Sequence, residues 1–253
     1  MFDCQCQNNP KLFRALSYIF GQAQEPQPAQ LSLSDHADRG LPDRFGGGLL
    51  APEAPTPGLP LARRLVLAST SRYRRMLLER LGIAFEVFSA DVDESRLTDE
   101  SPARMAQRLA EAKARAAMPR FPDSLVIGCD QVAESAGRIF GKPGNHANAT
   151  EQLLALSGAE AVFHNGLCVI DTSTGATRAR LVPFHVRFRR LDAGTIERYL
   201  LRETPYDCAG SARSEGLGIA LMESLRGDDP NALIGLPLIA LVDLLGEFGV
   251  HVP

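Results

Sequence analysis

The stretch LVLASTSRYRR, residues 65–75, decides the fold expected for this chain. An apolar β-type run passes into small hydroxyl residues and then into a helical pattern that carries three arginines. The first turn of a helix offers unpaired backbone N–H groups to an anion, and arginine adds bidentate donors for phosphate oxygens. The stretch therefore predicts a strand–turn–helix unit with an anion site at its turn. Taken alone, an ordinary turn with solvated arginines explains it at least as well.

Strand and helix signals alternate outward from this stretch, from about residue 62 to the end. Met76, Leu77 and Leu81 follow helical spacing, and Ser101-Pro102 is a typical helix start. The alternation of apolar and polar residues after a Thr174-Gly175 turn predicts a hairpin. The sequence thus predicts one α/β domain with a mixed sheet. The expected elements are strands at 65–68, 85–89 and 125–129, helices at 71–81 and from 101, a hairpin of 161–170 with 178–190, and helices at 192–201 and 237–248.

Residues 1–61 have a different composition, rich in proline and glycine. After a short apolar patch no periodicity persists, which is typical of disordered segments. The polar start does not match a secretory signal. We therefore expect residues 1–61 to be a disordered extension that is dispensable for activity, and residues 62–253 to be the folded domain.

Composition excludes several classes of partner. With a formal net charge of -3 and 45% hydrophobic residues, the chain lacks the basic surface that binding to a nucleic-acid polymer usually needs. Its apolar runs are too short to span a membrane. Five scattered cysteines, with Cys4 and Cys6 lacking a second pair for zinc, favour reduced thiols and a cytoplasmic location. The sequence leaves the oligomeric state open, a homodimer included.

Acidic residues follow two of the expected strands. Asp130 comes directly after the apolar run LVIGC, and Asp91, Asp93 and Glu94 follow the strand at 85–89. Ligands of open α/β sheets gather at the carboxyl ends of strands, where a carboxylate can hold a metal ion or activate a water. The simpler interpretations are a cap at Asp130 and a solvated acidic turn at 91–94.

Two lysines and a glycine-flanked loop are further candidates for the site. Lys142 lies within Gly-Lys-Pro, which restricts its backbone and suits a phosphate contact, although it is also an ordinary turn. Lys113 borders the apolar stripe of its helix, where most lysines simply reach water. Arg213 and Glu215 lie in a glycine-flanked loop that a flat ligand can approach closely. Together these residues indicate a metal-assisted attack on a nucleotide phosphate. The chain lacks a P-loop motif and a dinucleotide fingerprint.

The motifs that contain these residues resemble those of the Maf family of nucleotide pyrophosphatases. The resemblance implies a long bent mixed sheet flanked by helices, related to inosine triphosphate pyrophosphatases. It also implies hydrolysis of a nucleoside triphosphate to the monophosphate and pyrophosphate with a divalent metal. The matching motifs, from residue 64 to about 243, are LVLASTSRYRR, ADVDES, RLAEAKA, IGCDQV, GKP, CAGSARSEGLG and DPNALIGLPL.

The same resemblance implies roles for individual residues. Asp130 matches the proposed general base and, with Glu94, would belong to a site for Mg²⁺ or Mn²⁺. Whether Asp130 acts as base or mainly as metal ligand stays open at this point. Four positions match the phosphate side of the family's site: Ser69, Arg74, Lys113 and Lys142.

Base preference in the family divides at three matched positions, here Tyr73, Gln131 and Glu215. In the family, the branch that hydrolyses dTTP and UTP has Arg, Thr and Gln at these positions. The branch that acts on 7-methyl-GTP has Trp, Gln and Glu. This chain is similar to the second, with tyrosine in place of tryptophan. Glu215 would accept from N1–H and the 2-amino group of guanine, and the Gln131 amide would donate to O6. The cationic methylated base favours both a carboxylate and stacking on the Tyr73 ring.

Three functional hypotheses follow from the sequence. The first is a cytoplasmic, metal-dependent 7-methyl-GTP pyrophosphatase. The second is a pyrophosphatase for dTTP, UTP or CTP. The third is a nucleotide-binding regulator of septum formation that needs no hydrolysis, which the family's association with septa suggests. Tyr73 also has the spacing of a core residue, so a purely structural role for it is a further alternative.

Overall fold

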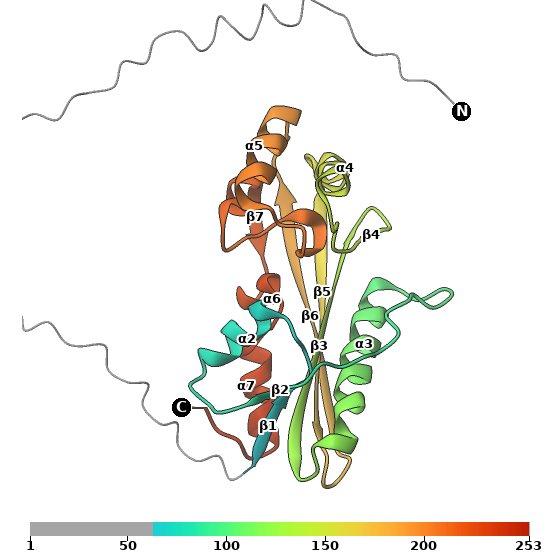
Figure 1. Ribbon diagram of the computed structural model, residues 1–253, viewed down its shortest axis with the longest axis vertical. Coiled ribbons are helices and arrows are strands. Elements are labelled where there is room, and N and C mark those ends of the chain that lie inside the picture. The colour runs from blue at the N-terminus through green and yellow to red at the C-terminus, as the bar shows by residue number, and fades with distance from the viewer. Residues whose placement is uncertain (1–62, 253) are drawn as a thin grey trace, which may run out of the picture. The chain divides into compact units, whose positions relative to one another are not determined.

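The computed structural model describes residues 63–252, and the sheet of this part of the chain is mixed and seven-stranded (Figure 1). The strand order is β2-β1-β3-β5-β6-β7, and β4 pairs with β3. β1 is parallel to β2 and β3, and the other pairs are antiparallel. The strands are β1 (Arg64–Leu67), β2 (Glu86–Val87), β3 (Ser124–Ser135), β4 (Arg138–Phe140), β5 (Glu160–Asp171), β6 (Thr177–Phe188) and β7 (Met222–Arg226).

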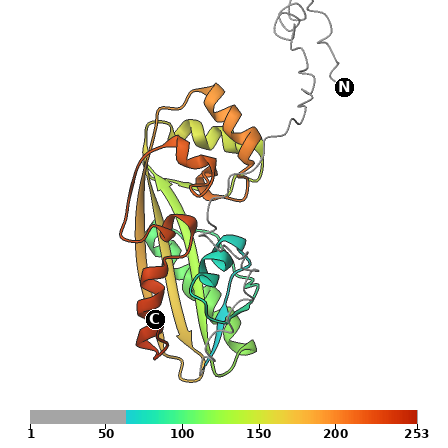
Figure 2. The same cartoon turned by 90° about the vertical axis from the view of Figure 1, so that its left-hand side faces the viewer.

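Helices pack near both ends of the long central strands. Figures 1 and 2 show α4 and α5 at one end of the long strands β3, β5 and β6, with α2, α3 and α7 at the other end. The α-helices are α2 (Arg72–Glu79), α3 (Pro102–Ala117), α4 (His146–Leu156), α5 (Ala193–Glu203), α6 (Asn231–Ile234) and α7 (Leu238–Glu247). Three short 3₁₀ turns are η1 (Met118–Arg120), η2 (Ala209–Ser211) and η3 (Leu217–Leu221).

Alternation along the strands assigns each core cluster to a face. Val66 and Val126 pack under α3, whereas Leu67 and Ile127, one residue further along, pack against α2 and α7. The face of the sheet that α7 covers continues along β3 to Ala133, where α4 and α5 pack against it. The predicted α/β fold, with a long mixed sheet flanked by helices, is therefore confirmed.

Two glycines allow α3 to lie close against the sheet. A Cβ atom at Gly128 would come 2.0 Å from the carbonyl oxygen of Ala110, and one at Gly166 would come 2.1 Å from that of Ala106. No side chain larger than hydrogen fits at either position without moving the helix. The close contact determines where the buried face of α3, and with it Lys113, meets β3.

Several predicted elements differ in detail from the structure. The strand expected to end at Cys129 continues to Ser135, because β5 supplies hydrogen-bonding partners along its whole length. Asp130 therefore lies inside a strand and not directly after one. The strand expected at 85–89 shortens to two residues. Met76 is 57% exposed, contrary to prediction, because α2 turns Leu77 and Leu78 to the core.

The hairpin and the last two long helices are confirmed, with Asp192 as the N-cap of α5. The predicted disordered extension, residues 1–61, lies outside the described residues, as do Cys4 and Cys6. Among residues 63–252, no helix combines the length and apolar character needed to cross a bilayer.

Candidate active site

The site lies at a gap in the sheet beside β3. β1 accompanies β3 only as far as Ile127, and β4 takes up the pairing at Ala133. Within the described part of the chain, residues 128–132 thus have no neighbouring strand on that side. Asp130 faces α3, and the next residue, Gln131, faces the opposite side. Because the sheet is open here, both side chains reach one cavity.

The turn between β1 and α2 forms one wall. Ser71 caps α2 by accepting from the backbone N–H of Arg74 at 3.5 Å. The Ser69 hydroxyl accepts from the backbone N–H of Ser71 and from Nη1 of Arg74, both at 3.3 Å. Arg74 Nε donates to the carbonyl oxygen of Gly235 at 2.9 Å, which fixes the guanidinium. The predicted strand–turn–helix unit is confirmed, and it turns Arg74 toward the cavity.

A buried lysine lies between two carboxylates at the centre of the site. Lys113 Nζ is 2.5 Å from Oδ1 of Asp130 and 2.6 Å from Oε1 of Glu94. Lys113 and Asp130 are 8% and 7% exposed, so this lysine does not simply extend into water. The ammonium of Lys113 lowers the pKa of Glu94 below its usual range, and Lys142 and Arg74 lower it further.

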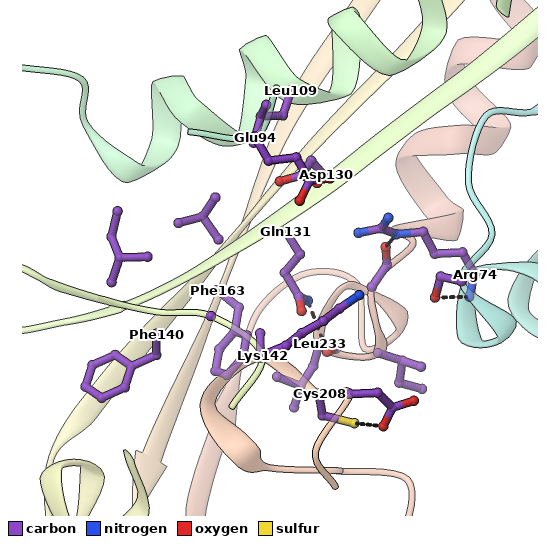
Figure 3. A pocket seen from close by; sticks show the side chains of 18 of the residues that line it. Arg74, Glu94, Leu109, Asp130, Gln131, Phe140, Lys142, Phe163, Cys208 and Leu233 are labelled. Carbon is purple, nitrogen blue, oxygen red and sulfur yellow. Dashed lines mark hydrogen bonds between the residues drawn. The ribbon is translucent and has the colours of Figure 1, made fainter. Parts of the chain in front are cut away.

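These groups line a cavity of about 410 Å³ (Figure 3), a size typical of small-ligand sites. A second cavity of about 380 Å³ adjoins it and shares Arg74, Lys113 and Lys142 with it. Ser69 and Thr70 line only the second cavity. The shared wall of both cavities therefore carries most of the positive charge, and three of the four predicted phosphate-side residues meet there: Arg74, Lys113 and Lys142.

The other end of the first cavity is mostly apolar and holds Gln131. Its Nε2 donates to Oδ1 of Asn165 at 3.1 Å and to the carbonyl oxygens of Ala232 and Leu233 at 2.9 and 3.1 Å. Two backbone acceptors fix the orientation of this amide. Figure 3 shows Gln131 beside Leu233 at this end of the cavity. In this arrangement the hydrogens of the amide are used within the protein and Oε1 is the atom left to accept, so the geometry does not favour the expected donation to a base.

Glu215 lines the same cavity, whereas Tyr73 does not. The Tyr73 hydroxyl accepts from Arg72 at 2.6 Å and donates to Asp207 at 3.4 Å. Partial burial, together with the neighbouring Cys208 thiol, raises the pKa of Tyr73 to about 12. The Arg72 guanidinium lies 4.7 Å from the centre of the Tyr73 ring. Tyr73 thus belongs neither to the core nor to the cavity lining, and its ring is partly covered by arginine.

Sequence reasoning missed several residues of this cavity. Asp207 and Cys208 lie at its mouth between Tyr73 and η2, and Phe140 and Phe163 form part of its apolar wall. Figure 3 shows the two phenylalanines on the side away from Arg74. Phe163 could not be told from any other buried strand residue, because its inward position depends on the β3–β5 register. Asp207 and Cys208 carry no local signal in the sequence.

An open α/β sheet with a helix start, fixed cations and carboxylates at one cavity is typical of enzymes that act on phosphate groups. The chain belongs to the Maf-like protein family, whose model matches residues 64–248.

Relatives from three bacteria carry the name 7-methyl-GTP pyrophosphatase. The protein from Methylobacillus flagellatus is 53% identical over 188 residues, which cover 74% of this chain and 98% of the relative. The protein from Aromatoleum aromaticum is 54% identical over 190 residues, or 75% and 98% of the two chains. That from Burkholderia orbicola is 55% identical over 185 residues, or 72% and 88%.

Proposed function

We propose that this protein hydrolyses 7-methyl-GTP to 7-methyl-GMP and pyrophosphate. The observation that carries the proposal is a single cavity whose lining combines fixed cations with two acceptors, Gln131 Oε1 and Glu215. Relatives that are 53–55% identical over most of their length bear the name of this activity.

The base end suits guanine better than a pyrimidine. Guanine presents two adjacent donors, N1–H and the 2-amino group, and two acceptors from the protein match them. Thymine and uracil present one donor between two carbonyl oxygens, which Glu215 would repel. Methylation at N7 makes guanine cationic, so the carboxylates of Glu215 and Asp207 attract it more strongly than the neutral base. Gln131 contributes as an acceptor in this arrangement.

The phosphate end supplies positive charge without large rearrangement. Arg74 is already held by Gly235 and Ser69, so its free donors are oriented before a ligand arrives. Lys142 and the first turn of α2 add further positive charge on the same wall. Preorganised donors of this kind stabilise the charge that develops on phosphate oxygens during hydrolysis.

The residues present fit a divalent metal only if the substrate completes its coordination. Among residues 63–252 there is no group of three or more His, Cys, Asp or Glu side chains with metal-binding geometry. Glu94 and Asp130 are two carboxylates that already share a cation, Lys113, beside the phosphate wall. Mg²⁺ is commonly held by one or two carboxylates together with phosphates, so we propose Mg²⁺ or Mn²⁺ here. A bound ion would neutralise phosphate oxygens.

In the proposed reaction Asp130 accepts the proton of the attacking water. Its Oδ1 is bound by Lys113, which leaves Oδ2 for the water. Lys113 keeps the carboxylate in one orientation through α3, whose position is fixed by its contact with the sheet. Displacement at the α-phosphorus then releases pyrophosphate toward Arg74 and Lys142.

Phosphorus NMR of the products tests this proposal. Wild-type protein with 7-methyl-GTP and Mg²⁺ or Mn²⁺ is expected to yield 7-methyl-GMP and pyrophosphate in equal amounts, and Asp130→Asn is expected to yield both far more slowly. Release of inorganic phosphate and 7-methyl-GDP would contradict the reaction. We further propose a cytoplasmic location, which the free thiols of Cys129, Cys168 and Cys208 support. Light scattering on the same sample tests whether the protein is a homodimer.

A further inference from the structure

One arginine outside the cavity holds the carboxylate that lines it. Nε of Arg213 is 3.2 Å from Oε1 of Glu215. Arg213 lines neither of the two adjoining cavities, whereas Glu215 lines the first. Arg213 therefore makes no direct contact with a ligand in either cavity.

Arg213 is itself anchored on a third residue, Glu203, at the end of α5. The Glu203 side chain is 9% exposed, and its Oε1 accepts from Nη1 of Arg213 at 2.8 Å. Its Oε2 accepts from the backbone N–H of Leu217 at 2.7 Å. A Cβ atom at Gly216 would lie 2.7 Å from the same carboxylate, so the backbone passes very close to it. Glu203 thus binds the loop on both sides of Glu215.

The same guanidinium also reaches the neighbouring wall of the site. Its central carbon lies 5.7 Å from the centre of the Tyr73 ring, within the range of a cation–π interaction. The backbone N–H of Arg213 donates to the Tyr199 hydroxyl at 3.0 Å, which fixes the start of the loop. Four groups therefore restrict Arg213, and Glu215 is the one among them that contacts the cavity.

We propose that Arg213 is a positioning residue for Glu215, and that the selectivity for the base depends on it. This inference rests on the proposed function in so far as Glu215 contacts the base. The planar guanidinium bridges two carboxylates in fixed directions, which the compact ammonium of a lysine does not do. With Arg213 in place, Oε1 of Glu215 is held, and Oε2, which accepts from the Ser214 hydroxyl at 3.4 Å, keeps a second lone pair for the ligand.

A purely structural role makes a different prediction. If Arg213 only stabilised the fold, its loss would reduce hydrolysis of every nucleotide by the same factor. If it acts through Glu215, its loss matters for substrates that Glu215 binds and has no further effect once Glu215 is changed. The coupling energy between Arg213 and Glu215 therefore distinguishes a positioning role from a purely structural one.

The experiment is a double-mutant cycle with Arg213→Met, Glu215→Gln and their combination, assayed on 7-methyl-GTP and dTTP. Arg213→Met is expected to lower kcat/KM for 7-methyl-GTP about tenfold, mainly through KM, and to change that for dTTP less than about twofold. In the Glu215→Gln background it should change neither by more than about twofold. Arg180→Met is the matched control, since Arg180 also pairs with a glutamate, Glu247, far from the site.

Equal losses on both nucleotides, or multiplicative effects in the double variant, would overturn the inference. Arg213→Lys keeps a charge beside Glu203 in case the methionine variant does not fold, and the same loss of selectivity is expected of it. If wild-type protein prefers dTTP, the proposed function fails on its own. The coupling is then measured on dTTP, where a multiplicative result would still reject Arg213 as the positioning residue.

Discussion

Replacing Lys113 with methionine should destabilise the protein, because the substitution leaves the buried carboxylate of Asp130 without its positive partner. Lys113 pairs with Asp130, which is 7% exposed, and with Glu94, whose side chain is 62% exposed. Breaking a buried pair by removing one partner costs about 3–5 kcal/mol, whereas an exposed pair contributes about 0–1 kcal/mol. Because Asp130 faces the cavity, we expect the lower value, about 3 kcal/mol.

Urea unfolding of the wild-type protein and three variants measures this effect. Lys113→Met should lower the free energy of unfolding by about 3 kcal/mol, or the Tm by roughly 6–12 °C for a domain of this size. Adding Asp130→Asn should restore a large part of that loss, because no uncompensated carboxylate remains. Adding Glu94→Gln should restore little, since that carboxylate is already in water. If Glu94→Gln rescued the variant as well as Asp130→Asn, the assignment of the buried charge to Asp130 would be refuted.

Three further predictions concern the same domain. Asp130→Asn should lower kcat by about 10²–10⁴ while the nucleotide still binds, and an equal loss of binding in calorimetry would contradict its role as a base. Gly166→Ala should displace α3 and destabilise the protein by about 1–3 kcal/mol, whereas Gly246→Ala, which meets no atom within 4 Å, should not destabilise it. Arg108 lowers the pKa of Glu100 from 4.5 to about 2, so this contribution to stability is complete above about pH 4.5 and is lost as the pH falls toward 2. Glu100→Gln should therefore flatten the decline of Tm with acid relative to wild type.

Local patterns in the sequence were sufficient for the elements that depend on them. The apolar run at 65–67, the cap at Ser71 and the alternation within β6 each predict an element that the structure contains. Met76 follows helical spacing but lies exposed, because three apolar neighbours in a short helix fit more than one face. The length of β3 depends on pairing with β5, which lies about 35 residues further along the chain, so no local pattern marks its end.

The site was predictable where charge and backbone chemistry define it, and less so where packing does. Asp130, Lys113 and Glu94 meet as expected, because a strand, a helix and a loop converge on one cavity. The donors of Gln131 are used by carbonyl groups of Ala232 and Leu233, which lie about 100 residues away in the chain. A contact of that kind is determined only by the folded arrangement, and no local pattern in the sequence indicates it.

Competition between two nucleotides in one vial tests the central claim most directly. Wild-type protein with equal concentrations of 7-methyl-GTP and dTTP should consume the methylated nucleotide first. The ratio of the two rates gives the ratio of kcat/KM values, and Glu215→Gln should bring that ratio closer to one. Consumption of dTTP at an equal or greater rate by the wild-type protein would contradict the account.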